Sequence, residues 1–76
     1  MKTYVTFGQD HVHSINGKTF DKDCVAVIEA PTAAEGRQRA MEAFNGVFCF
    51  SYPEDRWEEH QQMVYFRRGY LELENL

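Results

Sequence analysis

The sequence predicts an α+β fold in which one main helix packs on a small, mostly antiparallel four-stranded sheet, in the order β-β-α-β-β. Two observations support this class. Short runs of β-branched, aromatic and alternating apolar residues are typical of strands, and only the segment 32–45 has apolar residues at helical spacing. With 76 residues the chain is long enough for one domain and too short for two, so we expect a single domain over residues 1–76.

The first predicted element is a strand over the β-branched and aromatic residues 3–7. Further along, Asn16-Gly17 is a strong hairpin signal, because a two-residue type I′ turn needs positive φ at both positions. A turn of that length sets the pairing of the flanking residues. It places Ile15 opposite Lys18 and His13 opposite Phe20.

The same register, extended to the longer strands, predicts which side chains face the core. It pairs Phe7 with Ala26 and Val5 with Ile28. One face then carries the most apolar set, and burial of such a face specifies a register; its members are Val5, Phe7, Cys24, Ala26 and Ile28. Gly8 and the charged residues 21–23 interrupt the ladder, so we expect one long bent hairpin or two hairpin segments.

The helix is predicted to start after Thr32, which forms a capping box with Glu35. Gly46 follows at the position of a left-handed C-cap, so the helix should span about residues 33–45. One side of the helix carries small residues and one ring, which would let it lie close to a sheet: Ala33, Gly36, Ala40, Ala43 and Phe44.

The C-terminal part is predicted to contain two more strands. Residues 47–52 are typical of a buried strand that ends at Pro53. The polar stretch 54–63 is interpreted as a loop or a short helix. Residues 70–74 alternate, so we expect a half-buried strand with Leu71 and Leu73 pointing inward.

Composition and charge exclude several classes of protein. The formal net charge is −4, without the basic surplus that phosphate neutralisation requires, which argues against nucleic-acid binding. No apolar run approaches the ~20 residues of a membrane span. Lys2 is not followed by the apolar run of a signal peptide, so we expect none. Cys24 and Cys49 lie in apolar runs, which predicts buried, reduced thiols and a cytoplasmic protein.

His11 and His13 are the most suggestive pair of metal-ligating side chains in the sequence. Alternate residues of a strand share a face, so both imidazoles could approach one ion. A catalytic zinc site needs a third protein ligand, and Cys24 or His60 would serve only if the fold brought one of them near. We therefore predict no metal site, no cofactor and no catalytic residue. A small histidine- or metal-dependent hydrolase that uses His11 and His13 is the alternative.

Arg67 and Arg68 are the strongest candidates for binding. They follow aromatic residues and precede the last predicted strand. Guanidinium groups beside rings can hold a phosphate, a carboxylate or a base by paired hydrogen bonds and stacking. We expect a working surface that contains both arginines and Tyr70, with His11 and His13 of the hairpin and Trp57 as an anchor.

The chain resembles a group of short bacteriophage and prophage proteins. The resemblance rests on residues 8–13, 16–21 and 24–30, and on 48–50 and 66–69, where Arg67 replaces the proline of a Pro-Arg-Gly motif. It covers most of the chain but assigns no functional residue, because the group has no settled activity. The resemblance implies a role during phage infection, because small phage proteins of this kind often bind and block host factors, including components of anti-phage defence.

From these observations we expect a non-catalytic phage-type binding protein that acts in the host cytoplasm. Its expected partner is a host protein, or an anionic small-molecule signal that it sequesters. A structural or assembly protein of the virion is a further alternative. The sequence leaves a homo-oligomer open.

Overall fold

The computed structural model describes residues 1–15, 17–58 and 66–73. Its elements run in the order β1 (Lys2–Thr6), β2 (His13–Ile15), β3 (Lys18–Phe20), β4 (Cys24–Glu29), α1 (Ala33–Ala43), β5 (Phe50–Pro53), the 3₁₀ helix η1 (Glu54–Arg56) and β6 (Gly69–Glu72). The α+β class is confirmed. The order β-β-α-β-β is not confirmed, because four of the described strands precede α1.

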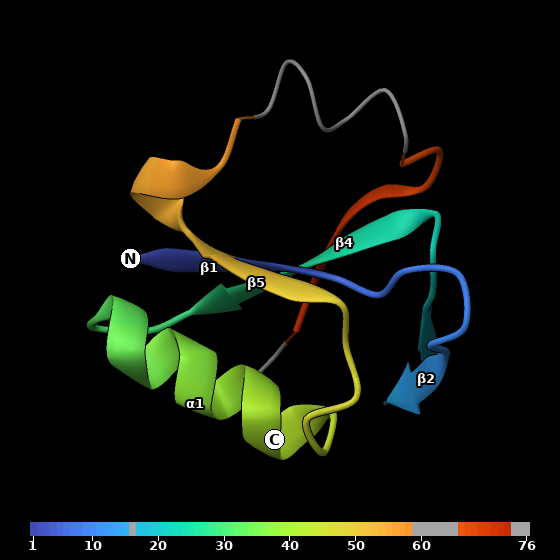
Figure 1. Cartoon of the computed structure of the whole chain (residues 1–76), viewed down its shortest axis with the longest axis horizontal. Helices are drawn as coiled ribbons and strands as arrows, with labels where there is room; N and C mark the ends of the chain where they lie inside the picture. Colours follow the sequence, from blue (N-terminus) through green and yellow to red (C-terminus); the bar gives the residue numbers. More distant parts are fainter. Residues whose placement is uncertain (16, 59–65, 74–76) are drawn as a thin grey trace.

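The main sheet has four strands and is mixed, because two of its three strand pairs are antiparallel and one is parallel. Its strand order is β5-β1-β4-β6, and β2 and β3 form a separate two-stranded sheet. Strand β1 is antiparallel to both β4 and β5, whereas β6 is parallel to β4. Figure 1 shows α1 lying along one side of the main sheet. Strand β2 lies at the other end of the view, at the lower right.

The predicted hairpin is present as two separate segments. In the first, β2 and β3 pair with Ile15 opposite Lys18 and His13 opposite Phe20, which confirms the predicted register. Asn16, the first residue of the predicted turn, lies outside the described residues. The second segment is the antiparallel pair β1–β4.

The predicted pairing of β1 with β4 is wrong by two residues. Val5 lies opposite Ala26 and Thr3 opposite Ile28, instead of Val5 opposite Ile28. The connection 7–12 is longer than the connection 21–23, so the ladder slips between the two segments. Because side chains alternate with a period of two, a slip by an even number leaves each residue on its predicted face.

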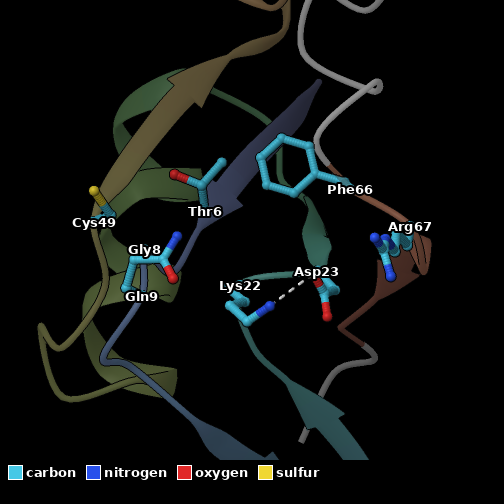
Figure 2. Close-up of a pocket in the computed structure, with 8 residues that line it drawn as sticks. All are labelled: Thr6, Gly8, Gln9, Lys22, Asp23, Cys49, Phe66 and Arg67. Atoms are coloured by element: carbon cyan, nitrogen blue, oxygen red, sulfur yellow. Dashed lines mark hydrogen bonds and ion pairs between the residues drawn. The ribbon is translucent and has the colours of Figure 1, made fainter.

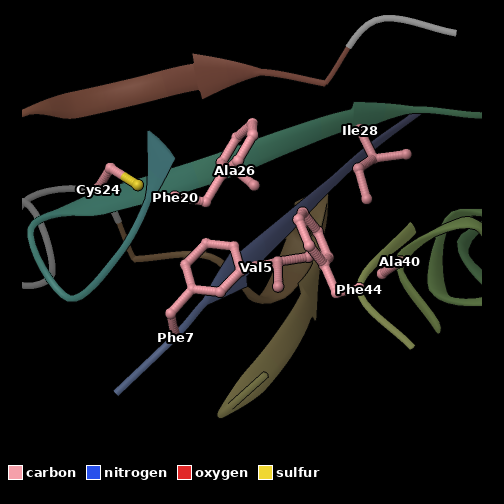
Figure 3. Close-up of a cluster of buried hydrophobic side chains, with 8 residues drawn as sticks. All are labelled: Val5, Phe7, Phe20, Cys24, Ala26, Ile28, Ala40 and Phe44. Carbon is pink, nitrogen blue, oxygen red and sulfur yellow. The ribbon is translucent and has the colours of Figure 1, made fainter. Parts of the chain in front are cut away.

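The predicted apolar face is accordingly the core face. Val5, Phe7, Cys24, Ala26 and Ile28 are buried together with Phe20, Ala40 and Phe44 (Figure 3). The rings of Phe7 and Phe44 meet edge to face, with centroids 5.0 Å apart. Such aromatic packing supplies much of the apolar burial that a chain of this size needs.

Helix α1 begins as predicted and ends two residues early. Thr32 is the N-cap, and its hydroxyl oxygen accepts a hydrogen bond from the Glu35 amide at 3.2 Å. At the other end Phe44 caps the helix, and Gly46 takes the expected left-handed conformation with φ of 71°. Gly36 and Ala40 are buried against the sheet, as the small-residue face predicted.

The predicted strand over 47–52 is present only in its second half, and the prediction that it is buried is wrong. Strand β5 starts only at Phe50 and lies at the sheet edge, paired on one side with β1. The Phe50 side chain is 58% exposed. Cys49 is also exposed, which corrects the prediction that both thiols are buried; Cys24 is buried as expected, and both are free thiols.

The last strand, β6, is close to its predicted position. Leu71 and Leu73 are partly buried and pack against the core, as the alternation indicated. Of the stretch 54–63, η1 agrees with the expected short helix, and residues 59–63 lie outside the described part, as do residues 74–76. Within the described part, no helix has the length and apolar character needed to cross a membrane.

Candidate functional site

A pocket of about 590 Å³ lies where three connections of the chain meet. Among the residues that the structure describes, the end of β1 and the segment after it, the turn before β4, the residue before β5 and the turn before β6 form its wall. Its lining residues are Thr6, Gly8, Gln9, Lys22, Asp23, Cys49, Phe66 and Arg67 (Figure 2).

The turn before β4 is formed by local hydrogen bonds. The Asp21 carboxylate accepts a bond from the Asp23 amide at 3.0 Å, and the Asp21 carbonyl accepts one from the Cys24 amide at 3.3 Å. Asp side chains commonly close turns in this way. The result is that Lys22 and Asp23 are presented at the pocket, where their side chains form an ion pair at 3.4 Å.

The turn before β6 is closed by the Gly69 amide, which donates to the Phe66 carbonyl at 3.1 Å. The same turn is joined to its neighbour, because the Arg68 amide donates to the Asp23 carbonyl at 2.8 Å. Phe66 and Arg67 therefore stand beside Lys22 and Asp23, although more than forty positions separate them in the sequence.

Gly8 lets the segment after β1 lie close to Cys49 on the opposite wall of the pocket. Its φ is +66°, and an added Cβ would lie 3.4 Å from the Cβ of Cys49. Few side chains tolerate that backbone conformation. The turn at Gly8 places the exposed Gln9 at the rim, where Figure 2 shows its amide group directed toward the middle of the pocket.

Arg67 and Arg68 have different surroundings. Arg67 is exposed and lines the pocket, and it has no hydrogen bond or ion pair with any residue that the structure describes. Arg68 instead donates from Nη1 to the Thr19 carbonyl at 2.6 Å and lies 3.3 Å from the Asp21 carboxylate. Arg68 thus ties β3 to the turn before β6, so only Arg67 is available to a ligand in the pocket.

Trp57 and Tyr70 belong to an aromatic group on the sheet face opposite α1. The Trp57 indole Nε1 donates to the Tyr70 hydroxyl at 2.9 Å, and the Trp57 ring stacks on Tyr4 with centroids 4.9 Å apart. Tyr70 is 36% exposed. The Phe66 ring lies 6.4 Å from that of Trp57, so this group adjoins the pocket without lining it.

His11 and His13 do not reach the pocket. His13 Nε2 lies 2.6 Å from the Val47 carbonyl oxygen, which can only accept, so Nε2 donates this hydrogen bond. The same ring packs against Phe7 and Phe44, at 5.9 and 5.0 Å. His11 is half-buried in the connection between β1 and β2. Across residues 1–15, 17–58 and 66–73, no three His, Cys, Asp or Glu side chains gather as metal ligands, and His60 falls outside these ranges.

Of the six predicted binding residues, the structure thus places Arg67 at the pocket and the other five elsewhere. Sequence reasoning did not assign Gln9, Lys22, Asp23 or Cys49 to a site. The charged residues 21–23 could have indicated the site, because they predicted a loop beside the apolar strands. Nothing in the sequence indicated that this loop would meet the arginine turn.

Comparisons of the chain with protein-family models, with curated proteins and with solved structures found no match.

Proposed function

We propose that this protein is a non-catalytic binding protein that holds a small anionic molecule in the pocket between Lys22 and Arg67. In the phage setting that the sequence resemblance implies, such binding would sequester a signal of host anti-phage defence in the host cytoplasm. The ligand would be an anion, and a host protein is the competing partner.

The observation that carries the proposal is the state of Arg67. Its guanidinium lines a pocket and has no partner among the described residues, while Lys22 supplies a second cation nearby. The chain as a whole is acidic and Lys22 is paired with Asp23, so the net positive charge of the pocket comes from Arg67. Guanidinium and ammonium groups bind phosphate and carboxylate by charge-assisted hydrogen bonds.

The hydrolase alternative receives less support from the geometry. It needs His11 and His13 to act together, but the Nε2 proton of His13 is already donated to the Val47 carbonyl. The His13 ring is also part of the aromatic packing around Phe44. These contacts are those of a histidine that stabilises the fold, so the binding proposal is preferred.

The test is a titration of the protein with pyrophosphate, followed by amide chemical shifts in two-dimensional NMR spectra. Shifts should change first at Gln9, Lys22 and Arg67. Arg67→Ala and Lys22→Ala should each weaken binding by about tenfold, as expected for the loss of one charge-assisted contact of about 1.4 kcal/mol. The control is Arg37→Ala, which removes the same charge from an exposed position on α1, outside the pocket lining.

Equal weakening by Arg37→Ala would show only a general charge effect and would contradict the proposal. So would shift changes that avoid the pocket. A host-protein partner is tested separately, by comparing what wild type and the Arg67→Ala variant retain from a host lysate. Small molecules and proteins are identified by mass spectrometry, and retention of a protein but of no anion would favour the competing partner. Co-purification with virions would favour an assembly role.

A further inference from the structure

We infer that the anion held in this pocket is a nucleotide, with its base against Phe66 and its phosphate between Lys22 and Arg67. This inference rests on the proposed function and adds the class of the ligand. Three properties of the pocket lead to it: an aromatic wall, a mixed set of polar groups, and a volume larger than a simple anion requires.

The aromatic wall is Phe66. Its ring is half-buried and lies 6.4 Å from that of Trp57, whose own position is set by stacking on Tyr4. Figure 2 shows the Phe66 ring beside Thr6 at one side of the pocket, across from Gln9 and Lys22. A ring held at a pocket wall offers a stacking surface to a planar base, whatever the base is.

The polar groups do not suit a bare anion. Asp23 lines the same pocket as the two cations, and its carboxylate would repel a phosphate that came near it. A ligand with an anionic end and an N–H-bearing end resolves this conflict. In the complex, Lys22 turns from Asp23 to the phosphate beside Arg67, and N–H groups of the base replace the Lys22 ammonium at the Asp23 carboxylate. The Gln9 amide both donates and accepts, so it matches the mixed edge of a base.

The size of the pocket agrees with this ligand. About 590 Å³ lies within the ~300–1,000 Å³ of typical small-molecule pockets. The charged groups and the Phe66 ring are separate parts of the wall, so a phosphate alone contacts only the charged part. A nucleotide reaches both parts at once, and its affinity should exceed that of its sugar phosphate.

The experiment compares AMP, GMP, ribose 5-phosphate and inorganic phosphate by NMR titration of the full chain. Wild type should bind at least one nucleotide about tenfold more tightly than ribose 5-phosphate, the order of one base–aromatic stack. Phe66→Leu should remove that difference and leave the affinity for ribose 5-phosphate unchanged. Phe50→Leu changes an exposed ring outside the pocket lining and should have no effect on either ligand.

One readout does not depend on a folded variant. In wild type bound to the nucleotide, base protons should show nuclear Overhauser effects to the Phe66 ring protons. The inference would be overturned if the nucleotide and ribose 5-phosphate bound with equal affinity, or if the base protons showed no contacts to Phe66. Either result would leave the proposed function standing. If none of the four probes binds in a manner that depends on Arg67, both fail.

Discussion

Arg68 donates a hydrogen bond from its guanidinium to the backbone carbonyl of Thr19, at 2.6 Å. The two residues lie 49 positions apart, and their contact holds the β2–β3 hairpin against the turn before β6. A second contact runs in the opposite direction, because Lys18 of β3 donates from Nζ to the Glu72 carbonyl of β6 at 3.0 Å. The hairpin is therefore attached to β6 by side chains that reach backbone carbonyls.

This contact predicts different effects for the two neighbouring arginines. Arg68→Ala should lower the free energy of unfolding by about 1–2 kcal/mol, because a partly exposed, charge-assisted hydrogen bond is lost. Arg67→Ala should change it by less than about 0.5 kcal/mol, as at other exposed positions. Urea denaturation of both variants checks this, and equal midpoints would contradict the separation of roles.

The contact between β1 and α1 gives a second prediction. Thr3 Oγ1 is buried and has no hydrogen-bond partner among the described residues, and a Cβ added at Gly36 would overlap it. Thr3→Val should raise the unfolding free energy by about 1 kcal/mol, because an unsatisfied buried hydroxyl is replaced by a methyl group. Thr19→Val, at an exposed position, is the control and should change little.

Gly36→Ala should act in the opposite direction. Alanine favours a helix over glycine by about 1 kcal/mol, but the overlap with Thr3 forces α1 away from the sheet at a cost of about 1–3 kcal/mol. We expect a lower thermal midpoint. A stabilised Gly36→Ala variant would mean that the helix can shift freely on the sheet.

The two thiols should differ in reactivity. Burial raises the pKa of the Cys24 thiol, and the nearby Asp21 and Asp23 carboxylates add to that effect, against a hydrogen bond to the Asp21 backbone and the charge of Arg68. Cys49 is exposed. A thiol reagent at pH 8 should therefore modify Cys49 rapidly and Cys24 only on unfolding. Fast modification of the native Cys49→Ser variant would contradict this.

The raised pKa of Cys24 also predicts a pH dependence of stability. Above the ordinary thiol pKa of about 8.5, the unfolded state releases this proton while the folded state keeps it. The unfolded state then binds fewer protons, so stability is full below about pH 8.5 and declines as the pH rises toward the folded-state pKa. Cys24→Ala should show a weaker decline between pH 8 and 10 in matched denaturation curves.

The histidine pair should not hold a stoichiometric metal ion. His13 is engaged with the Val47 carbonyl, and the described residues offer no third ligand beside the pair. Elemental analysis of the purified protein should find far less than one zinc per chain. About one zinc per chain, lost when both His11 and His13 are changed to Ala, would restore the hydrolase alternative.

Local sequence determined the elements whose hydrogen bonds close within a few residues. The two-residue connection after Ile15 set the pairing of His13 with Phe20, and the hydroxyl of Thr32 set the start of α1. The core face was also predictable although the β1–β4 register was not, because alternation depends only on whether a slip is even or odd.

Tertiary structure decided everything that depends on contacts between distant segments. The slip that pairs Val5 with Ala26, the parallel position of β6 and the edge position of β5 follow from connection lengths and packing across the whole chain. The pocket also depends on contacts between distant segments, because Gln9, Lys22 and Arg67 come from three separate connections. Adjacent in sequence, Arg67 and Arg68 looked equivalent. They differ because only the folded chain brings the Thr19 carbonyl within reach of one guanidinium and leaves the other beside the pocket.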